Sequence, residues 1–166
     1  MKEKTIILNH EQIMHKLRRM AYQIYEANAF RDHVVIAGIS EQGYKLASLL
    51  RDEVAHIAPF KMTLCRVTMD KTNPIDTVTC DLSLDHIKDQ SIILVDDVLH
   101  SGTALIYGVG YFLQVPLAQF KTAVLVDRNH KKYPIKADFK GISLSTSLNE
   151  NVVTDFSQGN YSASLV

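Results

Sequence analysis

Two neighbouring carboxylates, Asp96 and Asp97, follow the apolar run 92–95 and precede the small-residue turn 101–104. The apolar run predicts a buried strand, and the turn predicts a helix start, where backbone N–H groups and the helix dipole can bind a phosphate. The hydroxyl groups and the glycine of the turn add donors and allow a close approach of the backbone. Because carboxylates repel a phosphate, the pair is expected to face sugar hydroxyls, a magnesium ion or a cationic transition state.

Each half of this unit has a simpler interpretation when it is taken alone. An acidic pair can end a strand, and Ser-Gly can form a structural turn. Receiver domains that accept a phosphoryl group also carry an acidic pair after a strand, but near the start of the chain. Here the pair follows two predicted helices, which disfavours the receiver class. The whole unit favours a ligand site beyond the carboxyl ends of parallel strands.

The surrounding elements alternate between helical and extended patterns. Asn9 can cap a helix that runs to about Asn28, because apolar residues recur in it at spacings of three and four. The other predicted elements are a strand at 33–37 ended by Gly38, a helix at 43–54, a strand at 61–66, a strand at 91–95, a helix at 102–114, a strand at 122–126 and a polar, short-stranded tail from Ile142. This alternation predicts an α/β fold, with a mostly parallel, twisted sheet and helices on both faces.

The pattern weakens between residues 67 and 89. Turn-forming residues occupy 70–74, and 77–82 can form one arm of a hairpin. A long, weakly patterned segment inside a compact domain is typically functional or mobile. An ordinary surface hairpin is the alternative.

The composition limits the class of protein. With 166 residues, 46% of them hydrophobic and 22% charged, the chain is expected to form one domain over 1–166. Lys+Arg and Asp+Glu are both 18, so the net charge is zero and nucleic-acid binding would depend on a local patch. Two cysteines are too few for a disulfide framework, and the histidines lack metal-ligand spacing, so a reducing compartment and no zinc site are expected. No apolar run is long enough to cross a membrane, which favours a cytoplasmic location.

The unit 92–104 resembles the phosphoribosyl-diphosphate signature of type I phosphoribosyltransferases: four apolar residues, two acids, two apolar residues and a hydroxyl- and glycine-rich turn. The resemblance implies a type I phosphoribosyltransferase-like sheet and transfer of a phosphoribosyl group to a nucleobase. It gives Asp96 and Asp97 to the ribose hydroxyls, and it makes His100 a candidate for proton exchange with the base or for hydrogen bonding to phosphate or water. The implied phosphoribosyl diphosphate-binding residues are Asp96, Asp97, Val98, Leu99, His100, Ser101, Gly102, Thr103 and Ala104. The family usually has threonine where Ala104 stands.

A second block narrows the resemblance. Residues 125–141, followed by Thr146 and Ser147, are similar to the corresponding block of PyrR-type proteins, which are pyrimidine-operon attenuators and uracil phosphoribosyltransferases. The resemblance implies uracil as the base and UMP as the product. It also implies Mg²⁺ brought by the substrate with no dedicated protein site, and a homodimer or larger homo-oligomer. The backbone of Val126, Asp127 and Arg128 is the implied base-binding region.

The resemblance places a pyrophosphate loop at 38–43, after the first strand of the sheet. Its implied contacts are Ser40, Glu41, Gln42 and Gly43. PyrR-type proteins carry a basic residue where Gln42 stands, and one lost charged donor in such a site costs about 3 kcal/mol, roughly a hundredfold in rate. Backbone amides and magnesium are the alternative source of charge stabilisation. Segment 67–82 matches in place the mobile hood that closes over the reaction, with Arg66 and Lys71 as cations at its root.

PyrR-type proteins bind RNA on a basic face, so the resemblance raises RNA as a partner. The cations that would form such a face are Arg18, Arg19, Arg128, Lys131, Lys132, Lys136 and Lys140. A solvated charged surface is the alternative interpretation. The sequence therefore leaves three functions open: a uracil phosphoribosyltransferase, a catalytically weakened regulator that binds a nucleotide or RNA, and a purine phosphoribosyltransferase.

Overall fold

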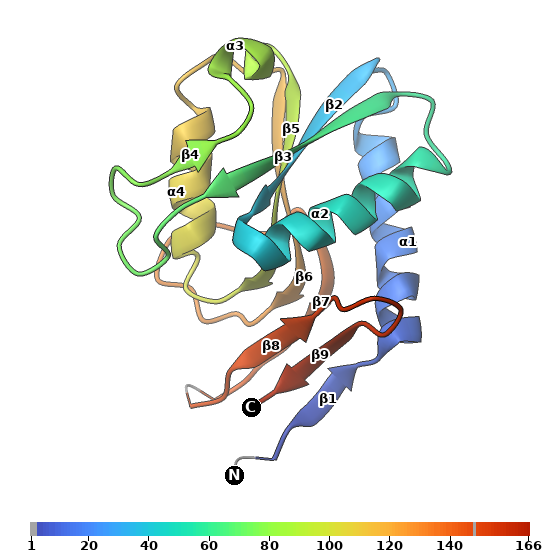
Figure 1. Cartoon of the computed structure of the whole chain (residues 1–166), viewed down its shortest axis with the longest axis vertical. Coiled ribbons are helices and arrows are strands. Elements are labelled where there is room, and N and C mark those ends of the chain that lie inside the picture. Colours follow the sequence, from blue (N-terminus) through green and yellow to red (C-terminus); the bar gives the residue numbers. More distant parts are fainter. Residues whose placement is uncertain (1–2, 148) are drawn as a thin grey trace.

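The computed structural model describes residues 3–147 and 149–166; Met1 and Lys2, the start of the expected domain, and Leu148 lie outside the described residues. The elements, in chain order, are β1 (Thr5–Leu8), α1 (His10–Ala27), β2 (His33–Ile39), α2 (Ser40–Ala55), β3 (Lys61–Thr68), β4 (Thr79–Cys80), α3 (Leu84–Ile87), β5 (Ser91–Leu99), α4 (Thr103–Phe112), β6 (Gln119–Asp127), β7 (Phe139–Ser143), β8 (Val152–Asp155) and β9 (Ser162–Leu165). They form two sheets, one in the order β4-β3-β2-β5-β6-β7 and one in the order β1-β9-β8 (Figure 1).

The larger sheet is parallel from β3 to β7, and only the short β4 runs antiparallel, against β3. Parallel neighbours require crossover connections, and α2 and α4 supply two of them. The expected α/β fold, with a mostly parallel sheet between helices, is therefore confirmed. The carboxyl ends of β2, β5 and β6 lie together at one edge of this sheet, which is where such folds bind ligands.

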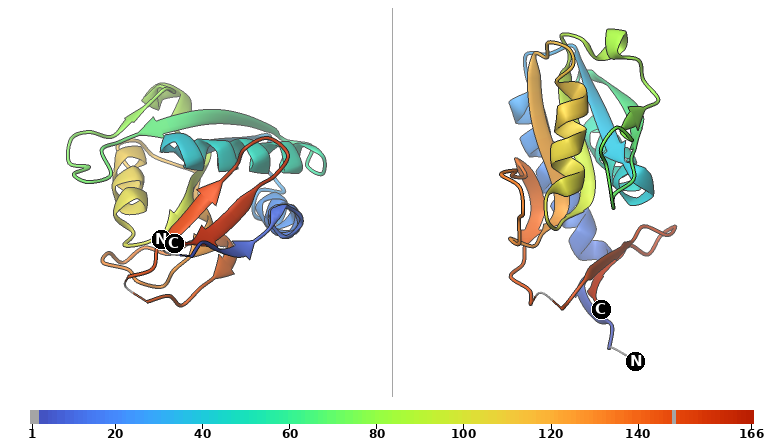
Figure 2. Two further views of the ribbon diagram at one scale, coloured as in Figure 1. Left: turned by 60° about the horizontal axis from the view of Figure 1, so that its bottom comes forward. Right: turned by 90° about the vertical axis from the view of Figure 1, so that its left-hand side faces the viewer.

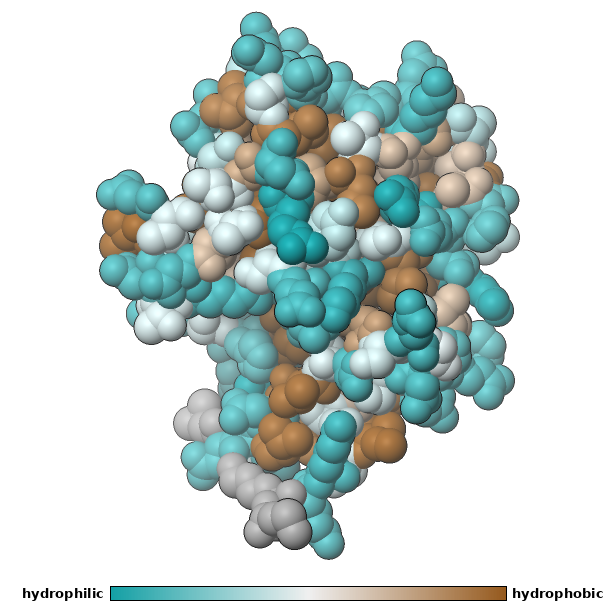
Figure 3. Space-filling view, viewed as in Figure 1, coloured by the Kyte–Doolittle hydropathy of each residue, from teal (hydrophilic) through white to brown (hydrophobic). Residues whose placement is uncertain are grey.

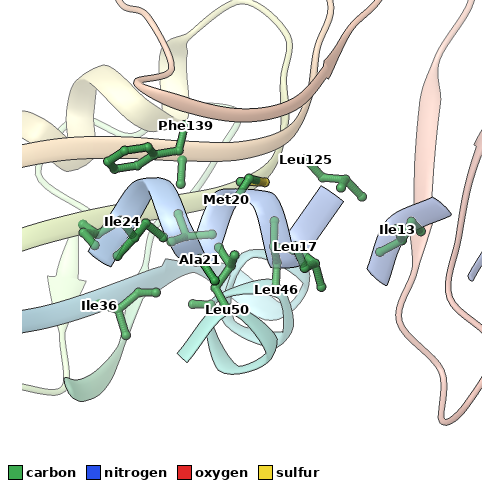
Figure 4. Packing of buried hydrophobic residues seen from close by; sticks show 14 of the residues in the cluster. Ile13, Leu17, Met20, Ala21, Ile24, Ile36, Leu46, Leu50, Leu125 and Phe139 are labelled. Carbon is green, nitrogen blue, oxygen red and sulfur yellow. The ribbon is translucent and has the colours of Figure 1, made fainter. Parts of the chain in front are cut away.

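The core lies on both faces of the large sheet. On one face, side chains of α1 and α2 pack against alternate strand residues such as Ile36 and Leu125 (Figure 4). On the other face, Leu105 and Phe112 of α4 pack against Ile92 and Leu94 of β5. The alternation follows from the strand period, since successive side chains point to opposite faces.

Helix α1 follows its sequence pattern closely. Asn9 Oδ1 accepts a hydrogen bond from the Gln12 N–H at 2.9 Å, and Gln12 Oε1 accepts one from the Asn9 N–H at 2.9 Å. This reciprocal capping satisfies two N–H groups at the start of the helix. The apolar stripe of α1 is buried, and it consists of Ile13, Leu17, Met20, Ala21 and Ile24.

Two of the boundaries that differ from the sequence prediction concern the site. Strand β2 does not end at Gly38 but runs to Ile39, and α2 begins at Ser40, so no loop separates them. A Cβ at Gly38 would lie 2.3 Å from Tyr44 Cα, so glycine is what lets α2 turn directly off the strand. Strand β5 does not end at Val95 but continues to Leu99, because its pairing with β6 extends through Asp96 and Val98.

The second sheet joins segments from opposite ends of the chain. Strand β9 lies between β1 and β8, so the tail, which the sequence predicted to be polar and short-stranded, forms two of the three strands of this sheet. Figure 2 shows this small sheet set apart from the large one, near the end where β5 and β6 finish. Strand β8 lies against β5, which brings the small sheet next to the paired acids.

The segment 67–82 forms the expected hairpin. Strand β3 extends to Thr68 and pairs with β4 at Val67–Cys80 and Thr68–Thr79. The connection is closed by the Asp70 N–H, which donates to Thr77 Oγ1 at 3.0 Å. Mobility of this hairpin over the site stays a prediction.

The surface of the face in Figure 3 is mostly hydrophilic, and its hydrophobic residues emerge in separate patches. Among the described helices, none combines the length and the hydropathy required to span a lipid bilayer.

Candidate functional site

A cavity of about 500 Å³ opens at the carboxyl edge of the large sheet. It is lined by Ser40, Glu41, Gln42, Lys71, Asp96, Asp97, Val98, Leu99, His100, Ser101, Gly102, Thr103, Ala104 and Leu105. Three segments that are distant in sequence therefore converge: the start of α2, the β3–β4 connection and the end of β5 with the turn after it. All nine residues from Asp96 to Ala104 that the sequence assigned to one ligand line the same space.

Asp96 is the buried member of the acidic pair. Lys71 Nζ donates to its Oδ1 at 3.1 Å and to its Oδ2 at 3.3 Å, from the β3–β4 connection. Burial raises the pKa of Asp96 to about 7; the positive charge of Lys71 lowers this pKa, and the neighbouring Asp97 raises it further. One acid is thus held in an internal ion pair, while the cavity beside it stays open.

Asp97 has a different environment because adjacent strand residues point to opposite faces. Its Oδ2 accepts a hydrogen bond from Thr154 Oγ1 of β8 at 2.6 Å. Its backbone N–H donates to Asp96 Oδ1 at 3.0 Å. The small sheet therefore orients the second carboxylate at the mouth of the cavity.

The turn 100–104 is shaped for an anion. Gly102 has φ +86°, and a Cβ there would lie 2.3 Å from Ile135 Cγ2, so only glycine fits. The backbone N–H groups of Lys132 and Tyr133 donate to the Ser101 carbonyl at 2.7 and 3.2 Å and hold the turn from outside. Inside, the Ser101 and Thr103 hydroxyls lie 2.7 Å apart, at the start of α4. Hydroxyl groups at a helix N-terminus can bind the oxygens of a phosphate.

His100 is held in one tautomer. Arg128 Nη1 lies 2.7 Å from His100 Nδ1, and a guanidinium only donates, so Nδ1 accepts and the ring proton is on Nε2. Burial lowers the pKa of His100, and the charge of Arg128 lowers it further. His100 is thus a neutral hydrogen-bond donor through Nε2.

The predicted pyrophosphate loop is the first turn of a helix in the structure. Glu41 forms an ion pair with Lys45 at 2.9 Å, and this contact is the main reason that the pKa of Glu41 is lowered. Gln42 lines the cavity, and its buried Oε1 has no hydrogen-bond partner among the described residues. Gly43 does not line the cavity but packs behind it, where a Cβ would lie 2.8 Å from the Val95 carbonyl.

The two predicted hairpin cations are placed differently. Lys71 reaches into the cavity, whereas the Arg66 guanidinium lies over the Tyr44 ring at 4.2 Å, outside the cavity lining.

The predicted base-binding residues also lie outside the cavity lining. The Arg128 N–H donates to the Leu99 carbonyl at 3.1 Å, and the Asp127 carbonyl accepts from the Leu144 N–H at 2.8 Å. The Arg128 side chain is buried and donates to Thr146 and to the Ser147 and Glu150 carbonyls. Their part in base binding, together with that of Val126, stays a prediction.

The cations grouped as an RNA face have partners within the chain. Arg19 donates to the Lys140 and Gly141 carbonyls at 3.0 and 2.7 Å. The others are Arg18 at 3.9 Å from Glu53, Lys131 and Lys140 at 3.7 and 3.8 Å from Asp127, Lys136 at 3.7 Å from Asp138, and Lys132 at 5.5 Å from the Tyr133 ring centre. Arg128 is buried, so its side chain does not belong to an exposed basic face. RNA binding by the other cations stays a prediction.

Sequence reasoning missed Thr154, which binds Asp97, and Ile135, which packs on Gly102. Thr154 lies 57 residues after its partner, inside a polar segment with no local pattern. Ile135 lies in the block 125–141, but nothing in that block indicated its contact with Gly102.

The cavity fits a magnesium ion carried by a ligand better than an ion held by the protein alone. Its carboxylates come from Asp96, Asp97 and Glu41, but the only group of three metal-ligating side chains found among the described residues lies elsewhere, at Cys65, Cys80 and Asp81. Mg²⁺ prefers several oxygen ligands and often takes them from phosphates. Carboxylate oxygens such as those of Asp96 and Asp97 are suitable ligands for Mg²⁺, and delivery of the ion by the substrate stays a prediction.

Comparisons with known proteins agree with this geometry. The family model of the phosphoribosyl transferase domain matches residues 3–157. The bifunctional protein PyrR of Bacillus subtilis is 31% identical over 169 residues, covering 95% of this chain and 93% of the relative. The bifunctional protein PyrR of Haemophilus ducreyi is 29% identical over 157 residues, covering 90% and 88%.

Solved structures show the same fold. A hypoxanthine-guanine phosphoribosyltransferase of Bacillus anthracis matches with a TM-score of 0.76 at 18% identity, covering 99% of this chain and 100% of that chain. A hypoxanthine phosphoribosyltransferase of Trypanosoma cruzi in complex with IMP matches with a TM-score of 0.78 at 16% identity, covering 91% and 74%.

Proposed function

Because the chain is a phosphoribosyltransferase that belongs to the PyrR branch of its family, we propose that its cavity transfers the phosphoribosyl group of phosphoribosyl diphosphate to uracil, which gives UMP. The observation that carries the proposal is the cavity of about 500 Å³ that brings two carboxylates and a hydroxyl-rich helix start together. In the reaction, the bond between ribose C1 and the diphosphate oxygen breaks, and its electron pair leaves with the diphosphate. The N1 atom of uracil forms the new bond to C1 and loses its proton.

The residues divide this work by charge. Asp97 and Asp96 bind the ribose hydroxyls and keep negative charge near the cationic sugar of the transition state. The turn 100–104 binds the 5′-phosphate through its hydroxyl and backbone donors. Lys71 is the cation nearest to these acids in the cavity, so it can leave Asp96 for the incoming diphosphate. Mg²⁺ bound to the diphosphate would supply further neutralisation of the leaving group.

His100 acts in this scheme as a hydrogen-bond donor. Arg128 occupies its Nδ1 lone pair, so the neutral ring offers Nε2–H to a carbonyl oxygen of the base. Uracil carries two carbonyl oxygens, which such a donor can recognise. The proton of uracil N1 therefore requires another acceptor, such as the departing diphosphate.

Turnover with defined bases tests the proposal. The purified protein is mixed with phosphoribosyl diphosphate, MgCl₂ and either uracil, hypoxanthine or guanine, and nucleotide formation is followed by chromatography. We expect UMP from uracil and at least tenfold less product from either purine. A higher rate with hypoxanthine or guanine would instead establish a purine phosphoribosyltransferase.

A second candidate is a regulator that binds a nucleotide but turns over slowly. It is favoured by Gln42, which puts a neutral amide where PyrR-type proteins carry a cation, and by Ala104, which lacks a hydroxyl. The same experiment separates the two functions, since UMP binding by calorimetry without turnover of any base would establish the regulator. If the slow turnover is due to the missing cation at position 42, replacing Gln42 by arginine should raise it.

RNA binding, a homo-oligomeric state and a cytoplasmic location accompany this proposal as expectations. RNA binding is tested by a filter assay at increasing salt, because contacts to phosphates weaken steeply with ionic strength. Light scattering reports the oligomeric state. Uniform affinity across salt concentrations would contradict a phosphate-binding face.

A further inference from the structure

A second cluster of reactive side chains lies outside the cavity, at the root of the β3–β4 hairpin. The sulfur atoms of Cys65 and Cys80 and a carboxylate oxygen of Asp81 all lie within 4.8 Å of one another. Cys65 is buried in β3, Cys80 is half-buried in β4, and Asp81 is exposed directly after it. We propose that these three side chains bind a zinc ion, with water in the fourth position.

The register of the hairpin favours a bound metal over a disulfide. Cys80 pairs with Val67, so Cys65 is its diagonal neighbour on the same face of the ladder. Diagonal residues in an antiparallel pair are about 7–8 Å apart, while the Cα atoms of a disulfide usually lie about 4.4–6.8 Å apart. Two thiolates that share a tetrahedral zinc ion at about 2.3 Å are about 3.8 Å from each other. The present donor atoms, all within 4.8 Å of one another, are close to that spacing, whereas a diagonal pair of residues is usually wider than a disulfide spans.

The donor chemistry selects a soft or borderline cation. Thiolate sulfur suits zinc, while Mg²⁺ takes oxygen ligands, so this cluster and the cavity would bind different metals. Thiolate is the form of cysteine that binds a metal, so both sulfurs lose their protons when the ion binds.

A neighbouring group holds the carboxylate in place. Asp81 Oδ1 accepts a hydrogen bond from the Arg66 N–H at 2.8 Å, which ties the carboxylate to β3. Such an outer partner orients a ligand and strengthens a metal site. The sequence predicted no zinc site because the histidines lack ligand spacing, and the two cysteines are 15 positions apart; only the pairing of β3 with β4 brings them together.

Cobalt(II) is the probe for this site. The chain has two cysteines, so a thiolate-to-cobalt absorption band reports this cluster alone. Untagged protein is reduced, treated with a chelator, desalted and titrated with CoCl₂, followed by ZnCl₂. We expect one cobalt ion per chain, a saturable thiolate band, release of protons and displacement by zinc.

Variants assign the ligands. Cys80→Ser and Asp81→Asn should each weaken the apparent cobalt affinity at least tenfold, since even outer-shell changes cost about 10- to 100-fold. Asp85→Asn removes a nearby exposed carboxylate and is the matched control, with wild-type affinity expected. Circular dichroism confirms that each variant is folded.

Two results would overturn the proposal. One is a titration without a thiolate band, or with equal affinity in Cys80→Ser. The other is rapid loss of both thiols to glutathione disulfide in reduced protein that binds no cobalt, which would make the pair a redox couple. The readout needs no substrate, so its outcome is independent of which base the cavity uses.

Discussion

Asp96 is the residue at which burial and charge oppose each other most directly. Burial raises its pKa to about 7, although Lys71 lies 3.1 Å from it. In the unfolded chain the pKa is near 3.8, so between these two values the folded state binds more protons. Stability therefore falls as the pH rises through this window.

Asp96→Asn should remove this penalty. We expect the variant to be more stable than the wild type at pH 8, by at most about 4 kcal/mol for three pKa units, and equally stable near pH 4. Urea unfolding at both values of pH measures the difference. Asp85→Asn changes an exposed acid and is the control, so its free energy of unfolding should depend on pH as in the wild type. If Asp96→Asn also kept the wild-type dependence of stability on pH, the raised pKa of Asp96 would be contradicted.

Asp97→Asn tests the ribose contact. The amide oxygen can still accept from Thr154, so the fold should persist, while the charge that strengthens bonds to sugar hydroxyls is lost. Hydrogen bonds to charged groups contribute about 1.5–3 kcal/mol, so UMP affinity should fall roughly 10- to 100-fold. Calorimetry with UMP measures it, and retained affinity would count against the site.

The site residues on β5 and its turn were predictable because one continuous stretch of sequence carries them. Their partners were not. Lys71 was identified as a hairpin cation, but its contact with Asp96 depends on how the β3–β4 connection folds over the sheet. The orientation of His100 depends on Arg128, 28 residues away, which the sequence had assigned to the base.

At the scale of elements, the junctions of strands with helices decide the shape of the site. The alternating patterns predicted which segments are strands and which are helices, but not that α2 begins directly at the end of β2 or that β5 runs past the acids. The two errors have different causes. Strand β5 runs past the acids because its pairing with β6 keeps them extended, and that neighbour is not visible in the local sequence. Helix α2 begins at Ser40 because Gly38 lets Tyr44 of the helix approach the strand end, which is a contact formed only in the folded chain.

Replacing Gly102 in the turn before α4, and Gly110 within α4, by alanine tests whether the turn requires glycine. Gly102→Ala places a methyl group against Ile135 at a positive φ, so it should destabilise the fold by about 1–3 kcal/mol and weaken UMP binding. Gly110→Ala, in the interior of α4 with nothing within 4 Å of its Cβ, should instead stabilise by about 0.5–1 kcal/mol. Urea unfolding compares them, and equal effects would show that the turn tolerates a side chain.

At the scale of the whole molecule, the site depends on two sheets. The large sheet supplies the acids and the turn, and the small sheet supplies the Thr154 hydroxyl. The sequence predicted the first, whose strands are long and apolar, but not the second, whose strands are short and pair across nearly the full length of the chain.

Thr154→Val tests the link between the sheets. Valine has nearly the volume of threonine but lacks the hydroxyl that donates to Asp97. A carboxylate that loses such a hydrogen bond should lower the free energy of unfolding by about 1–3 kcal/mol, which thermal unfolding measures. We also expect a lower affinity for UMP. Thr5→Val, an exposed change in the same small sheet, is the control. Unchanged UMP affinity in Thr154→Val would show that Asp97 needs no support from β8.

The pairing of β1 with β9 has a consequence during synthesis on the ribosome. Residues Thr5–Leu8 emerge from the exit tunnel well before their partner Ser162–Leu165, which is translated more than 150 residues later. Until then the nascent chain can assemble the parallel sheet, but β1 and β8 both lack β9, the strand that pairs with each of them. The pocket of a growing polypeptide therefore stays incomplete until β9 has emerged from the ribosome and paired with β1 and β8.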